Sequence, residues 1–72
     1  MARQIVMNAS GDTHYSFDPT DTEALRKAEE RFRALTGAGF TAARRKDGQA
    51  QLVRSFDPSA DETLFFPRLQ GG

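Results

Sequence analysis

The sequence predicts a small α+β domain in which two strands, one helix and three further strands follow one another along the chain. Three observations predict this class: a length of 72 residues, short apolar or alternating runs on either side of one helical pattern, and turn residues between the runs. A chain of this length forms one domain and buries only about 60% of the surface that its unfolded form exposes. Charged residues make up 28% of the chain and the formal net charge is zero, which is typical of a globular domain.

Two strands are expected at the N-terminal end. Residues 4–8 are mostly apolar, as in a strand that lies in the middle of a sheet. Residues 13–17 alternate, with Tyr15 and Phe17 on one face, which is typical of a half-buried strand. Because turn-forming residues occupy 9–12, we expect the two strands to form a hairpin.

A helix follows the first hairpin. Thr20 and Glu23 have the spacing of a capping box, in which Thr20 caps the helix and Glu23 reaches back to it. An apolar stripe at helical spacing consists of Leu25, Ala28, Phe32 and Leu35. The solvent side is predicted to carry Arg26, Lys27, Glu29, Glu30, Arg31 and Arg33. Gly37 is expected just after the helix, where a left-handed conformation often ends it.

Three more strands are expected in the second half of the chain, at residues 40–45, 49–56 and 63–66. Asp47-Gly48 lies between the first two, and this dipeptide is a strong signal for a hairpin turn. Residues 57–62 are predicted to form an irregular link with one helical turn capped by Ser59. Pro67 has no backbone N–H to donate and marks the end of pairing.

One tetrapeptide occurs twice in nearly the same form, as Phe17-Asp18-Pro19-Thr20 and as Phe56-Asp57-Pro58-Ser59. Duplication is one interpretation. The preferred interpretation is that both segments end a strand and then turn through Asp-Pro, because turn residues follow local geometry.

The residue content argues against catalysis by this chain. It has no cysteine, which excludes a disulfide, a thiolate metal site and a nucleophilic thiol. The single histidine, His14, has no second ligand at metal-binding spacing. Acidic residues are spread over the helix and turns, where capping and solvation account for them. We therefore predict no enzyme activity, no metal and no cofactor.

Composition also bears on location and partners. No apolar run approaches the roughly 20 residues that span a bilayer, and the N-terminus has no apolar leader, so the sequence predicts a soluble, cytoplasmic protein without a membrane partner. Arg44-Arg45-Lys46 with Arg54 could form a phosphate-binding patch. However, a net charge of zero argues against a nucleic-acid module, and a solvated hairpin is the alternative.

The last five residues, Arg68-Leu69-Gln70-Gly71-Gly72, resemble the Leu-Arg-Leu-Arg-Gly-Gly tail of ubiquitin. Asp18-Pro19-Thr20-Asp21-Thr22 is similar to the Glu-Pro-Ser-Asp-Thr junction before the ubiquitin helix, and Gln4-Ile5 is similar to the start of its first strand. The chain thus resembles ubiquitin-like modifiers of the β-grasp superfamily, and among them the prokaryotic type. This resemblance implies a β-grasp domain over 1–67, of order ββαβββ with a mixed sheet on one helix, and a flexible tail over 68–72.

The resemblance also implies a function. A partner activating enzyme would use Mg-ATP to adenylate Gly72, and Gly71 would pass where a side chain clashes. A conjugating enzyme would then join Gly72 to an amine of a target protein, and a metallopeptidase would cleave the product. The residues implied to bind partner enzymes are Arg68, Leu69, Leu52, Val53, Arg44 and Arg54, although alternation requires either Leu52 or Val53 to be a core residue. Lys27 and Lys46 are the only lysines that could act as acceptors.

Two other functions remain open at this point. The first is a sulfur carrier of the same fold, in which the activated Gly72 carboxylate becomes a thiocarboxylate. The second is a non-covalent β-grasp interaction module in which the two glycines have no chemical role.

Overall fold

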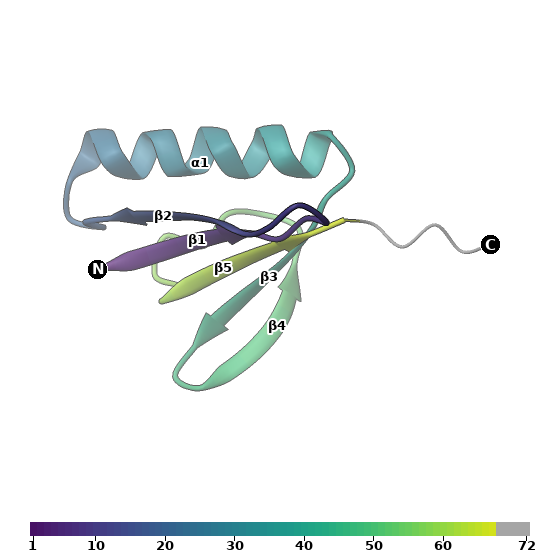
Figure 1. Cartoon of the computed structure of the whole chain (residues 1–72). Helices are drawn as coiled ribbons and strands as arrows, with labels where there is room; N and C mark the ends of the chain where they lie inside the picture. Colours follow the sequence, from purple (N-terminus) through teal and green to yellow (C-terminus); the bar gives the residue numbers. More distant parts are fainter. Residues whose placement is uncertain (68–72) are drawn as a thin grey trace.

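The computed structural model describes residues 1–67, which form an α+β domain with one helix and a five-stranded mixed sheet (Figure 1). This confirms the predicted class. The elements are β1 (Ala2–Val6), β2 (Thr13–Phe17), α1 (Thr22–Gly37), β3 (Thr41–Lys46), β4 (Gln49–Val53) and β5 (Glu62–Phe66).

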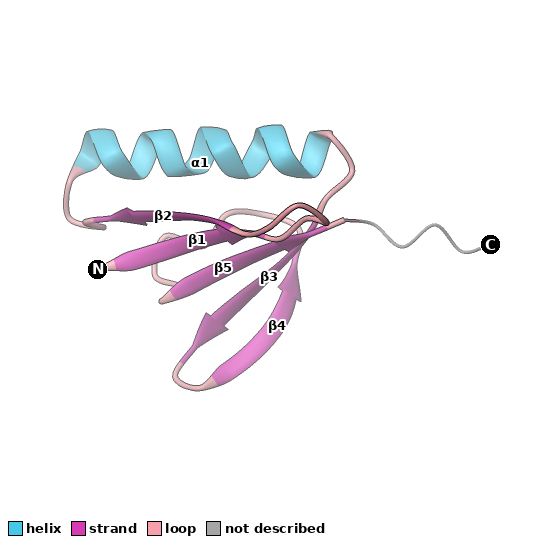
Figure 2. Ribbon diagram, viewed as in Figure 1, coloured by secondary structure: helices cyan, strands magenta, loops and turns pink. Residues whose placement is uncertain are grey.

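The strands lie in the order β2-β1-β5-β3-β4. The central neighbours β1 and β5 are parallel, and every other pair in the sheet is antiparallel. Helix α1 lies across one face of the sheet, which we call the helix face (Figure 2). No helix or strand of residues 1–67 covers the opposite face, which we call the open face.

The helix begins at Thr22, and its cap lies one residue later than predicted. Asp21, rather than Thr20, is the N-cap, and its Oδ1 accepts hydrogen bonds from the backbone N–H groups of Glu23 (3.0 Å) and Ala24 (3.3 Å). The Thr20 hydroxyl instead donates to Asp18 Oδ1 at 2.7 Å, as part of the turn before the helix. A carboxylate at this position also interacts favourably with the helix dipole.

The helix ends through Gly39 rather than through the predicted Gly37. Gly37 is the last helical residue, whereas Gly39 has φ +104°. The N–H of Gly39 bonds to the carbonyl of Thr36 (3.1 Å) and the N–H of Phe40 bonds to that of Leu35 (3.0 Å). These two bonds form a Schellman motif, and Leu35 and Phe40 both pack against the core.

The first strand lies two residues earlier than predicted, at Ala2–Val6 instead of 4–8. Asn8 already belongs to the turn, because its Oδ1 accepts from the backbone N–H of Ser10 (3.0 Å) and from its hydroxyl (2.7 Å). The β-strand pairing extends in the other direction instead, where Ala2 lies opposite Phe17.

The second hairpin has the predicted turn. Asp47 and Gly48 both have positive φ angles, 52° and 79°, as a two-residue type I′ turn requires. Strand β4 ends at Val53 rather than at residue 56, because the chain then turns back over the helix face and packs Phe56 against Phe32 at a ring-centroid distance of 6.0 Å.

The core lies between α1 and the sheet. Its buried cluster consists of Val6, Phe32, Ala42 and Phe65. Phe32 contacts Phe65 edge-to-face at a ring-centroid distance of 5.6 Å, a geometry that aromatic pairs favour. In the predicted apolar stripe, Ala28 and Phe32 are buried, Leu35 packs against the cluster and Leu25 is half-buried.

A polar contact also joins the helix to the sheet. Gln4 is fully buried, and its Nε2 donates to the backbone carbonyl of Ala28 (2.9 Å). Arg31 was predicted on the solvent side, but its Nη1 donates to Gln4 Oε1 (2.6 Å) and its guanidinium carbon lies 3.9 Å from the ring centroid of Tyr15. Arg31 is directed to the sheet because Gln4 and Tyr15 are neighbours across β1 and β2.

Within residues 1–67 no helix is long and apolar enough to cross a membrane.

Candidate functional site

The predicted conjugation residues Gly71 and Gly72 lie outside the described residues, as do Arg68 and Leu69. The described chain approaches them through β5. Strand β5 ends at Phe66, which lies opposite Thr41 at the start of β3.

An apolar row crosses the open face. The strand register places Ile5 beside Leu64, Leu64 beside Ala43, and Ala43 beside Leu52, so these four residues, the apolar row, span β1, β5, β3 and β4. His14 on β2 continues the row at the opposite edge. Ile5 and Ala43 are buried between their neighbours, whereas Leu52 is 68% exposed. The exposed apolar surface of the row therefore lies on Leu52 and, in part, on half-buried Leu64.

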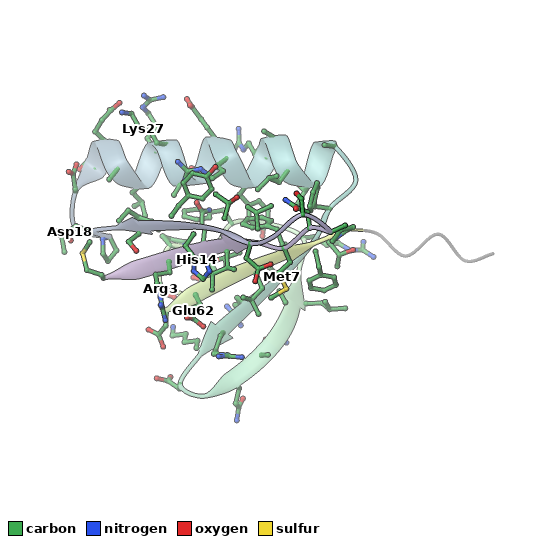
Figure 3. All side chains as sticks on the ribbon, viewed as in Figure 1. Arg3, Met7, His14, Asp18, Lys27 and Glu62 are labelled. Atoms are coloured by element: carbon green, nitrogen blue, oxygen red, sulfur yellow. The ribbon has the colours of Figure 1, made fainter. Side chains whose placement is uncertain are left out.

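Charged side chains form the next row of the same face. Arg3 and Arg45 lie on either side of Glu62, and both guanidinium groups donate to its carboxylate. The Arg45 Nη1 to Glu62 Oε1 distance is 3.3 Å, and the Glu62 side chain is only 13% exposed. Figure 3 shows Arg3 beside Glu62 at the start of β5, with Met7 farther along the strands. Two positive groups share one negative group, so this row carries a net positive charge.

The open face therefore combines an apolar centre with a polar, positively charged border. A surface of this composition can bind a protein partner, because apolar contacts exclude water and a charged border restricts the choice of partner. Within residues 1–67, moreover, no three His, Asp or Glu side chains gather as a metal ion would require.

The predicted partner-binding residues of the second hairpin do not share one surface. Leu52 lies on the open face, but Val53 points to the helix face and packs against the core. Arg44 also belongs to the helix face, where it pairs with Asp57. Arg54 is exposed just after β4. The sequence left open whether Leu52 or Val53 is the core residue, and the structure shows that it is Val53.

The two lysines lie on different elements, Lys27 on α1 and Lys46 on β3. Lys27 is exposed on α1, pointing away from the sheet (Figure 3). Lys46 is exposed at the end of β3, and its Nζ donates to the Ser59 hydroxyl at 2.9 Å. Both amines are at the surface.

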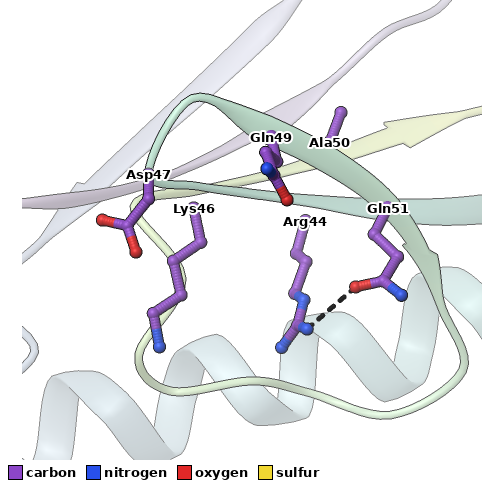
Figure 4. A pocket seen from close by; sticks show the side chains of 6 residues that line it. All are labelled: Arg44, Lys46, Asp47, Gln49, Ala50 and Gln51. Carbon is purple, nitrogen blue, oxygen red and sulfur yellow. Dashed lines mark hydrogen bonds between the residues drawn. The ribbon is translucent and has the colours of Figure 1, made fainter.

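A polar hollow of about 510 Å³ lies at the turn of the second hairpin (Figure 4). It is lined by Arg44, Lys46, Asp47, Gln49, Ala50 and Gln51. Its positive groups already have partners, because Arg44 contacts Asp57 and donates to Gln51 Oε1 (2.9 Å), and Lys46 contacts Ser59. We assign no ligand to this hollow.

The repeated tetrapeptide forms the same turn twice. Asp18 Oδ1 accepts from the N–H (2.9 Å) and hydroxyl (2.7 Å) of Thr20, and Asp57 Oδ1 accepts from the same groups of Ser59 at the same distances. The local-geometry interpretation accounts for both segments. In the second segment Asp57 is thus the hydrogen-bond acceptor and Ser59 the donor. Residues 57–62 contain a turn, and the predicted helical turn capped by Ser59 does not form.

The two aspartates differ in their surroundings. The hydrogen bonds from Ser59, together with the Arg44 guanidinium, lower the pKa of Asp57 from 3.8 to about 2. The hydrogen bonds from Thr20 also lower the pKa of Asp18, but no arginine of residues 1–67 pairs with it.

We expect the Asp57→Asn variant to be less stable than the wild type at pH 7 and equally stable at pH 2. A carboxyl whose pKa is lowered by folding contributes stability above its unfolded pKa, and that contribution is lost as the pH falls through its folded pKa. For Asp57 the loss occurs between about pH 5 and pH 2. Urea unfolding at several pH values measures it. Asp18→Asn is the matched control and should lose less stability at pH 7; equal losses would contradict a role for Arg44.

Sequence reasoning missed the open face as a unit. Arg3 and Ile5, like Glu62 and Leu64, are two residues apart, so alternation alone assigns each pair to one face. Only the strand register shows that the two pairs are neighbours. Comparison of the chain with protein-family models, with curated proteins and with solved structures finds no match.

Proposed function

We propose that this protein is a β-grasp protein modifier that becomes joined to target amines through the carboxyl group of Gly72. The observation that carries the proposal is the sequence Arg68-Leu69-Gln70-Gly71-Gly72, placed directly after the last strand of a small α+β domain. Gly71 and Gly72 have no Cβ atom, so this segment can enter a channel too narrow for other residues.

The β-grasp assignment is supported by the arrangement of the strands. The first and last strands, β1 and β5, are parallel neighbours. Strand β2 lies outside β1, strands β3 and β4 lie on the other side of β5, and the helix lies across one face. In this arrangement the last strand, β5, lies between β1 and β3. The segment after residue 67 thus follows a strand that is paired on both sides.

The proposed reaction takes place in partner enzymes. An activating enzyme binds Mg-ATP, and an oxygen of the Gly72 carboxylate attacks the α-phosphate, forming an acyl-adenylate and releasing pyrophosphate. A cysteine thiolate of the enzyme then attacks the acyl carbon, and AMP leaves. Finally, an amine of the target displaces the thiolate and loses a proton, which leaves an amide bond. The chain supplies the carboxyl group and no catalytic side chain.

The open face is proposed as the surface that partner enzymes recognise. Leu64 lies on β5 only two residues before the end of that strand, so a partner bound to the apolar row would be close to the point from which the tail leaves. Arg3 and Arg45 would favour acidic groups at the border of the partner's surface. We propose that Arg68 adds a charge-assisted contact and that Leu69 adds an apolar one.

Deleting Gly71-Gly72 is expected to abolish conjugation and to leave the melting temperature nearly unchanged, because a segment beyond the last strand adds little to the core. The experiment is intact mass spectrometry of N-terminally tagged chain purified from its host, with the wild type compared with the deletion. Isopeptide-linked adducts at Gly72 in the wild type alone are the expected result. The Lys27→Arg/Lys46→Arg variant is a control that should keep target adducts and lose self-adducts.

Other outcomes identify the alternatives. A gain of one sulfur in place of one oxygen at Gly72 would show a sulfur carrier and overturn conjugation. The absence of both modifications from the wild type would favour a non-covalent interaction module. A large drop in melting temperature on deletion would show that the last residues are part of the folded domain, contrary to the proposal.

A further inference from the structure

Strand β4 is an edge strand without the usual protection. It lies at one end of the sheet order, and nothing in residues 1–67 pairs with its outer side. Proteins commonly block such edges with charged side chains, proline or a bulge, because unpaired N–H and C=O groups can bind another strand. Residues 49–53 contain no charged residue and no proline, and their pairing with β3 is regular. The outer side of β4 can therefore accept another strand.

The hairpin turn determines which backbone groups point outward. In a two-residue turn the flanking residues, here Lys46 and Gln49, form a hydrogen-bonded pair, and such pairs alternate along the ladder. Gln51 is thus bonded to β3, whereas the N–H and C=O groups of Ala50 and Leu52 point away from the sheet. These outward groups are the donors and acceptors that a sixth strand would use.

We propose that two copies of the chain associate through antiparallel pairing of β4 with β4, about a two-fold axis at Gln51. Ala50 of each copy then lies opposite Leu52 of the other copy, and four backbone hydrogen bonds join the two strands. The side chains of Leu52 lie on the open face and are 68% exposed in the single chain. In the pair they approach each other diagonally, where aliphatic side chains can make contact.

Charge complementarity favours a second copy over another occupant. Asp47 precedes β4 and Arg54 follows it, so an antiparallel pair brings the Asp47-Gly48 turn of one copy beside Arg54 of the other. Neither side chain takes part in an ion pair within residues 1–67. No like charges lie opposite each other in the strand itself, because β4 carries none.

The association should be weak. One strand edge buries less than the roughly 1,200 Å² of a standard interface. Four hydrogen bonds add only a modest net free energy, because each of them replaces bonds to water. We expect a dissociation constant on the order of 0.1 to 1 mM, so the chain is monomeric when dilute.

Sedimentation equilibrium of the purified chain tests the proposal. Between about 10 μM and 1 mM the average mass should rise from 8.0 kDa toward twice that value, as mass action requires. Leu52→Lys should weaken association about tenfold or more, because it places the two introduced lysines diagonally opposite each other at the interface. The matched control is His14→Lys, at the other end of the same row on the other edge strand. A constant mass of 8.0 kDa, or equal effects of both substitutions, would overturn the proposal.

A second variant tests the register. Asp47→Asn keeps a residue that tolerates φ 52° and removes only the charge, so the turn should be retained. We expect association to weaken about two- to fivefold and to lose most of its salt dependence. Arg54→Gln should have the same effect. Unchanged association in both variants would overturn this register. The test uses the chain alone, so it is independent of any reaction at Gly72.

Discussion

Replacing Phe65 with alanine is expected to lower the free energy of unfolding by about 3 to 5 kcal/mol. Phe65 is 0% exposed and lies on the central strand β5, between Val6 of β1 and Ala42 of β3. It also makes the edge-to-face contact with Phe32. No polar group or solvent can fill the space that its ring would leave, so the cost includes both the lost burial and a cavity. In a domain of this size that loss approaches the whole stability.

The adjacent Phe66 provides the matched control. It has the same side chain on the same strand but points to the open face and is only half-buried. Phe66→Ala should cost about 1 kcal/mol, because part of its ring is already in contact with water. Urea unfolding monitored by circular dichroism measures both variants. Similar losses for the two substitutions would contradict the assignment of one face to the core and the other to solvent.

Replacing Gln4 with alanine is expected to cost about 2 to 4 kcal/mol, an unusually large loss for a polar residue. Gln4 is 0% exposed, and both ends of its amide have partners, at the Ala28 carbonyl and at Arg31. The substitution removes both hydrogen bonds and leaves a cavity between β1 and α1. Buried hydrogen bonds that involve a charged group are among the stronger ones.

A double-mutant cycle with Arg31→Ala separates the hydrogen bond from the packing. We expect the two substitutions together to cost less than the sum of their separate losses, by about 1 kcal/mol or more, because they share one contact. Arg33→Ala is the control on the same helix, since Arg33 is largely exposed and pairs only with Glu29. It should change stability by no more than about 0.5 kcal/mol. Additive losses for Gln4 and Arg31 would show that their contact contributes nothing measurable.

These two predictions concern the side of the sheet that holds the domain together, whereas the proposed interactions use the opposite side and one edge. Phe65 and Gln4 face α1, and the apolar row faces away from it. This separation has a practical consequence. Substitutions on the open face, such as Leu52→Lys, can test binding without unfolding the chain, because Leu52 is exposed already.

The local sequence determined which segments form strands and which forms the helix. Alternation identified residues 13–17 as a strand, the helical spacing of Ala28 and Phe32 identified the face of α1 that meets the sheet, and Asp47-Gly48 identified the second hairpin. These signals are reliable because they depend on backbone geometry and on burial of one face, both of which repeat at short range. The boundaries shifted by one or two residues where Asn8 and Asp21 make local hydrogen bonds that pattern alone does not reveal. Strand β4 ends three residues early, where the chain turns back and Phe56 packs against Phe32.

Only the tertiary structure decided which side chains are neighbours. Arg31 has the spacing of a solvent-facing helical residue, yet it contacts Gln4 and Tyr15 because β1 and β2 place those two side chains beneath it. Leu52 and Val53 are neighbours in sequence but lie on opposite faces, and Ile5 and Leu64 are distant in sequence but adjacent in the sheet. Strand register sets these relationships, and it depends on contacts between residues far apart along the chain. The sequence by itself therefore determined the elements and their turns, while long-range pairing decided which side chains form the core, the open face and the exposed edge.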